Sequence, residues 1–123
     1  MIISDFTYTS YLHLLKLIAK NGYTITGYHK YSEAAYPCIL RHDIDNDVEK
    51  ALELAKLEAD NSVQSTYFIL LNTNFYNVFS STVNKTLKEM TNNSLLMFIC
   101  KTKYFQKTIP NSLFQFYCQD PGY

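Results

Sequence analysis

Residues 39–80 read ILRHDIDNDVEKALELAKLEADNSVQSTYFILLNTNFYNVFS and carry the clearest structural signal in the chain. The apolar segment at residues 38–42 predicts a short strand that ends in a polar cluster. Residues 47–60 have apolar side chains at helical spacing, which predicts an amphipathic helix with an acidic or amide cap at its start. The unbroken apolar run at residues 64–71 predicts a buried strand. A strand, a helix and a second strand in this order predict a parallel βαβ unit.

Shorter elements are predicted on both sides of this unit. Residues 9–20 repeat apolar side chains at helical spacing and stop at an Asn-Gly dipeptide, which predicts a helix. Residues 23–28 are rich in β-branched and aromatic side chains and predict a strand, whereas residues 31–37 predict a loop or short turn. A further helix is predicted at residues 80–90, capped by one of the two serines at its start. The alternation predicts an α/β protein with about three βα units.

The 123 residues carry no net charge, because 11 basic side chains balance 11 acidic ones. This length suits a single domain, and the hydrophobic fraction of 47% is typical of a globular protein. The balanced charge argues against a nucleic-acid-binding protein, which normally carries a basic excess. The longest apolar run, at residues 95–100, is too short to span a bilayer, and the first residues lack the pattern of a signal peptide. We therefore expect a cytoplasmic protein without a membrane span.

The polar cluster at the end of the first central strand begins at Arg41 and reads RHDIDND. Because side chains alternate along a strand, Arg41, Asp43 and Asp45 are expected to share one face, and His42 the opposite face. Two carboxylates and a guanidinium at the carboxyl end of a parallel strand suit a metal site or an acid–base site. The alternative is a capped helix entrance, since acidic side chains stabilise a helix N-terminus. Capping accounts for Asp47 but not for Asp43, which still belongs to the strand.

Residues 39–80 resemble the polysaccharide deacetylase family, also known as carbohydrate esterase family 4 or the chitooligosaccharide deacetylase homology group. The similarity is greatest to an intracellular branch whose signature reads R-H-D-[IV]-D, then a helix, then S-T-[YF]-F. Here the first motif is RHDID at residues 41–45, and the second is STYF at residues 65–68. The resemblance covers roughly the first 90 residues.

An EF-hand calcium loop is excluded as an interpretation of the acidic stretch, because Val48 stands where that loop requires glycine.

This resemblance implies a deformed (β/α)7 barrel and the metal-dependent removal of an acetyl group from a sugar or polysaccharide precursor. It implies that Asp43 is the general base that activates water and that Asp45 is a ligand of a divalent metal ion, with zinc the first expectation. Such an ion lowers the pKa of bound water toward about 7 and polarises the acetyl carbonyl. Arg41 is the only arginine of the chain and is expected to orient Asp43.

The family also uses an H-x-x-x-H pair just after the next helix, and this sequence departs from that pattern. Its three histidines are His13, His29 and His42, and none lies beyond the third predicted helix. A complete barrel takes about 200–250 residues, so the chain supplies only part of one. We therefore expect residues 1–90 to be the N-terminal part of a truncated deacetylase-like domain with little or no activity. Residues 91–123 are expected to be a divergent tail, as an out-of-frame end would be.

Two other classes of function stay open. A partial barrel leaves strand edges unpaired, which favours a non-catalytic remnant or an interaction module that associates with itself. The D-x-D pattern of Asp43 and Asp45 is also found in glycosyltransferases that bind metal–nucleotide sugars, although the motif alone is short and common.

Overall fold

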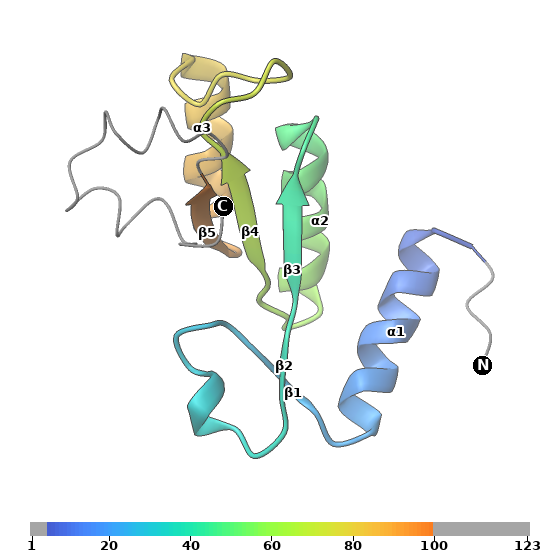
Figure 1. Ribbon diagram of the computed structural model, residues 1–123. Helices are drawn as coiled ribbons and strands as arrows, with labels where there is room; N and C mark the ends of the chain where they lie inside the picture. The colour runs from blue at the N-terminus through green and yellow to red at the C-terminus, as the bar shows by residue number, and fades with distance from the viewer. Residues whose placement is uncertain (1–4, 100–123) are drawn as a thin grey trace. The chain divides into compact units, whose positions relative to one another are not determined.

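The computed structural model describes residues 5–99 of the chain, apart from the side chains of residues 98 and 99. The chain divides into two compact units, and the boundary between them falls after Leu40. Each unit contains its own small parallel sheet (Figure 1).

The first unit consists of a helix followed by a two-stranded sheet. Its helix is capped by Thr7, whose side chain accepts a hydrogen bond from the backbone N–H of Ser10. The helix stops at the expected Asn-Gly dipeptide, where Gly22 has a φ of 85°, a left-handed conformation that glycine adopts without strain. The elements are α1 (Tyr8–Lys20), β1 (Thr24–Thr26), the short 3-10 helix η1 (Tyr31–Glu33) and β2 (Pro37–Ile39), with β1 and β2 paired in parallel.

The second unit is a three-stranded parallel sheet with two connecting helices. Its elements in chain order are β3 (Arg41–Ile44), α2 (Val48–Asp60), β4 (Thr66–Leu70), α3 (Ser81–Met90) and β5 (Leu95–Ile99). The strands lie side by side in the order β3–β4–β5, so each helix connects two neighbouring parallel strands (Figure 1). This part of the chain is therefore built from two successive βαβ motifs that share β4.

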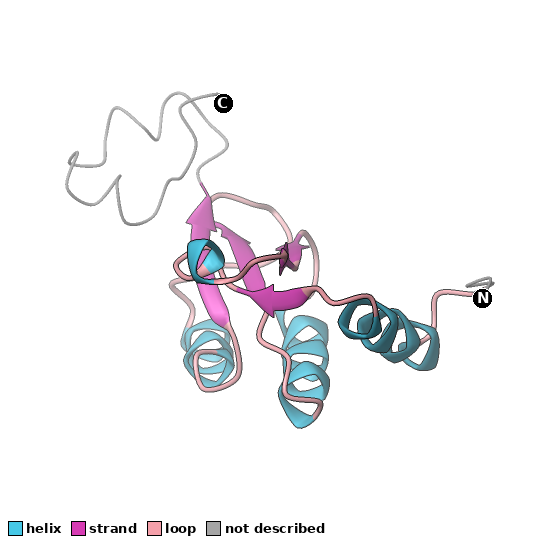
Figure 2. Cartoon of the chain, turned by 90° about the horizontal axis from the view of Figure 1, so that it is seen from below, coloured by secondary structure: helices cyan, strands magenta, loops and turns pink. Residues whose placement is uncertain are grey.

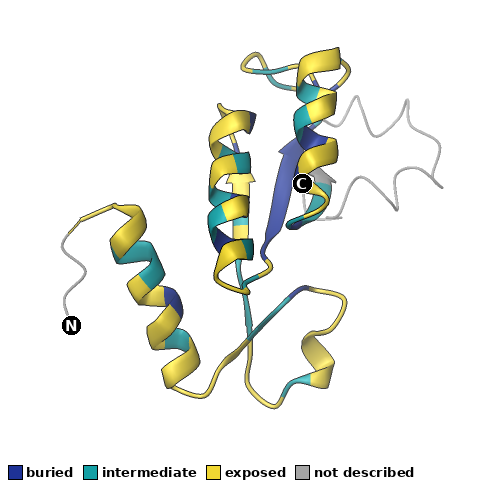
Figure 3. Cartoon of the chain, turned by 180° about the vertical axis from the view of Figure 1, so that it is seen from behind, coloured by how far each residue is buried: buried dark blue, intermediate teal, exposed yellow. Residues whose placement is uncertain are grey.

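Helices α2 and α3 lie on the same side of this sheet, as Figure 2 shows. The central strand β4 is buried along its whole length (Figure 3). Because its side chains alternate, Tyr67 and Ile69 pack against the helices, whereas Phe68 and Leu70 form a smaller cluster on the other face. The main core consists of eight buried side chains: Ile44, Val48, Ala55, Tyr67, Ile69, Val78, Leu87 and Met90.

Five of the predicted elements are confirmed, with ends that differ by at most two residues, and so is the α/β class. The single strand predicted at residues 38–42 is wrong. The chain instead forms the end of β2 and the start of β3, which belong to different sheets and are separated by Leu40. A continuous apolar run does not reveal where a strand changes its pairing partner.

Strand β5 was not predicted, because it lies in the segment that the sequence marks as divergent. It extends the sheet in parallel beside β4, from Leu95 opposite Thr66 to Ile99 opposite Leu70. Residues 100–123 of the expected tail lie outside the described part of the chain. Within residues 5–99 the two sheets do not close into a barrel.

The helices of the described residues are short, with 13 residues in α1, 13 in α2 and 10 in α3. A helix that crosses a bilayer needs about 20 predominantly apolar residues. None of these three helices has the length and apolar character that a membrane span requires.

Helix α2 ends with a residue that is left-handed but is not glycine. The backbone N–H of Ser62 donates to the carbonyl of Ala59 over 3.0 Å, and the N–H of Val63 donates to the carbonyl of Glu58 over 2.9 Å. This pair of hydrogen bonds is a Schellman motif, which places the residue after the cap in the left-handed region. Ser62 accordingly has a φ of 60°, where its Cβ crowds the backbone.

We expect Ser62→Gly to raise the free energy of unfolding by about 0.5–1 kcal/mol, because glycine adopts this conformation without the steric cost. Urea denaturation of the full chain measures the change. The reverse substitution, Gly22→Ser, introduces the same strain at the end of α1 and should lower the unfolding free energy by a similar amount. Unchanged unfolding midpoints in both variants would contradict this reading of the helix ends.

Candidate functional site

The carboxyl end of β3 carries the acidic residues of the predicted site. Within β3 the side chains of Arg41 and Asp43 are exposed. His42 and Ile44 lie on the opposite, more buried face, so the predicted alternation is confirmed inside the strand. Asp45 is exposed and follows directly after the strand. Both carboxylates therefore lie at the edge of the sheet where parallel α/β proteins place their binding sites.

Arg41 holds the carboxylate of Asp43 through two nitrogen atoms. Its Nε lies 2.8 Å from Oδ1, and its Nη2 lies 3.3 Å from Oδ2. The guanidinium carbon is 3.9 Å from the centre of the Phe68 ring, so a cation–π contact also fixes the arginine. The two side chains of the ion pair are 42% and 46% exposed, and the pair adds only about 0–1 kcal/mol to stability. The two contacts fix how the Asp43 carboxylate lies relative to Arg41.

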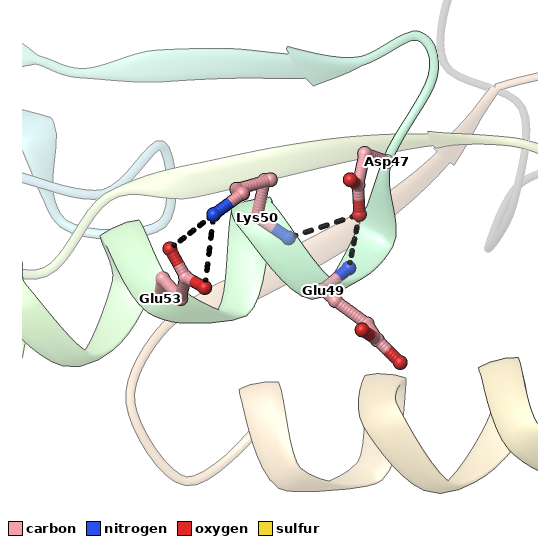
Figure 4. A network of polar contacts seen from close by, with 4 residues as sticks. All are labelled: Asp47, Glu49, Lys50 and Glu53. Carbon is pink, nitrogen blue, oxygen red and sulfur yellow. Dashed lines mark hydrogen bonds and ion pairs between the residues drawn. The ribbon is translucent and has the colours of Figure 1, made fainter.

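Asp47 has the capping role that was the alternative interpretation of the acidic cluster. Figure 4 shows its Oδ1 accepting hydrogen bonds from the backbone N–H groups of Glu49, at 2.9 Å, and Lys50, at 3.1 Å. The ammonium of Lys50 turns away to pair with Glu53 one turn further along α2. Asp47 is therefore the N-cap of α2. Capping does not account for Asp43 and Asp45.

Tyr76 ties the carboxyl ends of β3 and β4 together. Its hydroxyl donates to the carbonyl of Ile44 over 2.7 Å and accepts from the backbone N–H of Leu70 over 2.9 Å. Burial raises the pKa of this hydroxyl above its usual 10.0, the hydrogen bond from Leu70 opposes that shift, and the negative charge of Asp45 adds to it. Tyr76 thus fixes the peptide that immediately precedes Asp45.

A polar cluster on the helix side of β3 was not predicted from the sequence. Glu58 of α2 is 0% exposed, and both of its carboxylate oxygens have partners. Nε2 of His42 lies 2.6 Å from Oε1, and the hydroxyl of Tyr67 donates to Oε2 over 2.9 Å. The rings of His42 and Tyr67 lie 4.9 Å apart. Because a buried carboxylate is costly unless it is paired, these three side chains together fasten α2 to β3 and β4.

The sequence does contain one signal for this cluster. Glu58 follows Ala55 by three positions and Ala51 by seven, so it occupies the apolar face of the predicted helix. A charged residue at such a position requires a buried partner. His42, on the opposite face of the preceding strand from Asp43, is the candidate for that partner.

The described residues fit only part of the metal site that the family resemblance implies. Asp43 and Asp45 supply carboxylate oxygens at one edge of the sheet. The imidazole of His42 points to the opposite face, where it contacts Glu58. Within residues 5–99 no group of three or more His, Cys, Asp or Glu side chains lies close enough to hold a metal ion. The roles expected for Asp43, Asp45 and Arg41 therefore stay predictions.

We expect Tyr67→Phe to lower the free energy of unfolding by about 1–3 kcal/mol, because a buried carboxylate loses a hydrogen bond. Chemical denaturation of the full chain measures the loss. Tyr31→Phe is the matched control, since Tyr31 is exposed on the short η1 helix, and it should change stability by less than about 0.5 kcal/mol. Equal losses in the two variants would show that the Tyr67 hydroxyl does not support Glu58.

The raised pKa of Tyr76 predicts a loss of stability in alkaline solution. The folded protein holds this phenolic proton more tightly than the unfolded chain, whose tyrosines ionise near the usual 10.0. The contribution is complete below that pH and is lost as the pH rises through the higher folded-state pKa. Unfolding free energies measured from neutral pH to above about pH 10 should fall more steeply for the wild type than for Tyr76→Phe. Tyr8→Phe, at an exposed position, should keep the wild-type slope, and identical slopes for all three proteins would refute the assignment.

The chain matches no family model, no curated protein and no solved structure. The likeness of residues 39–80 to polysaccharide deacetylases thus depends on the RHDID and STYF motifs alone. The glycosyltransferase alternative also stays a prediction.

Proposed function

We propose that this chain is a section of a polysaccharide deacetylase-like (β/α)7 barrel and carries the carboxylate half of a divalent metal site. The observation that carries the proposal is the arrangement at the end of β3. Asp43 is oriented by a two-point contact with Arg41. Asp45 follows directly after β3, and the hydroxyl of Tyr76 donates to the carbonyl of Ile44 just before it. This edge is the one at which parallel βα units place catalytic groups.

The two carboxylates have different surroundings, which suits different roles. The Oδ1 atom of Asp43 has the shorter contact with Arg41, 2.8 Å against 3.3 Å at Oδ2. Oδ2 is therefore the more available oxygen to take a proton from an attacking water molecule. Asp45 is exposed, and its carboxylate is the available metal ligand. When bound, a divalent ion such as zinc would acidify water and polarise the acetyl carbonyl of the substrate.

The same site lacks the nitrogen ligands that would complete it. A catalytic zinc ion usually has three protein ligands, and these residues offer carboxylates only. The 123 residues contain no histidine after α3, where the resemblance implies a pair. We therefore propose weak metal binding and little or no deacetylation by this chain as it stands.

The experiment is a calorimetric zinc titration of the full chain, followed by measurement of acetate released from an acetylated amino sugar. We expect weak zinc binding, at least about tenfold weaker still in Asp45→Ala, and no acetate release above the background. Asp47→Asn is the matched control, because it removes an acidic charge two residues away but keeps a capping side chain.

Equal zinc affinity in the wild type and Asp45→Ala would contradict the metal assignment. Tight zinc binding with acetate release would instead contradict the proposed lack of activity. The open sheet, with β3 and β5 at its edges in the described residues, favours an interaction module as the second candidate. Concentration-dependent dimerisation in sedimentation experiments, without zinc binding, would support that candidate.

A further inference from the structure

The pairing of β3 with β4 brings the RHDID and STYF motifs together on one face of the sheet. In the register, Asp43 lies opposite Phe68, and Arg41 precedes Asp43 by two positions on the same strand. Because side chains alternate, all three lie on the face opposite to α2 and α3. A diagonal neighbour on an adjacent strand is within reach of a long side chain. Arg41 can therefore contact both the ring of Phe68 and the carboxylate of Asp43.

The ring of Phe68 is fixed by the smaller apolar cluster of the unit. Phe68 is 4% exposed, and it packs with Leu70, Tyr76 and Met97. The guanidinium of Arg41 covers the ring, with its central carbon 3.9 Å from the ring centre. Phe68 thus presents an ordered aromatic surface to a charged side chain that is 42% exposed.

Stacking on an aromatic ring affects how an arginine meets a carboxylate. A half-exposed arginine samples many rotamers, and the loss of that freedom opposes any ion pair that it forms. Contact with the ring of Phe68 restricts the guanidinium and removes water from one of its faces. The N–H groups lie in the plane of the guanidinium, so stacking leaves them available for hydrogen bonds. Nε and Nη2 of Arg41 accordingly reach Oδ1 and Oδ2 of Asp43 over 2.8 Å and 3.3 Å.

We propose that Phe68 is a positioning residue for the carboxylate of Asp43 and acts through Arg41. The ring holds the guanidinium in place, and the guanidinium holds Oδ1, so that Oδ2 keeps one orientation at the edge of the sheet. This assigns a role to the phenylalanine of the STYF motif. The functional part of the inference rests on the role of base proposed for Asp43, whereas the chain of contacts itself requires no metal ion.

The test is NMR spectroscopy of the full-length chain without zinc, in slightly acidic buffer. Arg41 is the only arginine of the chain, so a single arginine Nε–H resonance is expected. In the wild type, the ring current of Phe68 should move this proton signal upfield of its position in the urea-unfolded chain. Phe68→Leu keeps an apolar side chain but removes the ring. It should abolish the upfield shift and increase the exchange rate of the Nε proton about two- to fivefold, the value of one exposed cation–π contact.

Two further variants separate positioning from general packing. Leu70→Val removes one methylene group from the same apolar cluster and should leave both the shift and the exchange rate unchanged. Asp43→Asn removes the charged acceptor and should itself increase the exchange rate. Combined with Phe68→Leu, it should give a smaller increase than the product of the two single effects, because both variants break the same chain of contacts.

An unshifted Nε–H signal in the wild type would overturn the proposal, and this measurement does not depend on whether Phe68→Leu folds. So would equal increases of the exchange rate in Phe68→Leu and Leu70→Val. A double variant whose effect equals the product of the single effects would show that Phe68 does not act on Asp43 through Arg41. Because the samples contain no zinc, these outcomes are independent of the zinc titration of Asp45→Ala.

Discussion

The parallel hydrogen-bonded pairing of β3 with β4 determines where each side chain of the acidic stretch points. The register places Asp43 beside Phe68 and His42 beside Tyr67. A shift of one residue would exchange the two faces, placing Asp43 against the helices and His42 outside. Burial of Ile44 and Tyr67 in the main core makes such a shift costly. The exposed position of Asp43 is therefore a consequence of apolar packing on the other side of the strand.

Charged side chains on the two faces of β3 differ in their exposure to water. On the outer side, Arg41 and Asp43 remain in contact with water, so their pairing orients groups without contributing much stability. On the inner side, Glu58 has lost its hydration completely and depends on His42 and Tyr67 for hydrogen bonds. One short strand thus separates a candidate reactive site from a structural polar cluster.

The parts of this structure that the sequence predicts are those that depend on local pattern. The spacing of apolar residues predicts α2, and the continuous run of residues 64–71 predicts β4, because each pattern reflects burial of one element. The cap at Asp47 is also local. The split between β2 and β3 is not, since it depends on which strands pair, and β5 follows a segment without clear helical or strand punctuation.

The contacts of the candidate site also differ in whether the sequence predicts them, according to how far apart their residues lie in the chain. The Arg41–Asp43 pair joins residues two positions apart on one strand, so alternation alone predicts it. The contact of His42 with Glu58 spans 16 positions, and that of Tyr76 with Ile44 spans 32. Such contacts depend on how helices and loops return to the sheet, which periodicity does not describe. The sequence signal for this cluster is the position of Glu58 on the apolar face of the predicted helix, where a charged side chain needs a buried partner.

The hydroxyl of Tyr76 has a further consequence for the motion of the loop that follows β4. The amide proton of Leu70 is bonded to a side chain six positions later, so its exchange with solvent deuterium requires that side chain to move away. The exchange rate of this one proton therefore reports how often the loop opens, whereas the other amide protons of the sheet report local separation of its strands. A single amide resonance would follow the edge at which Asp43 and Asp45 lie.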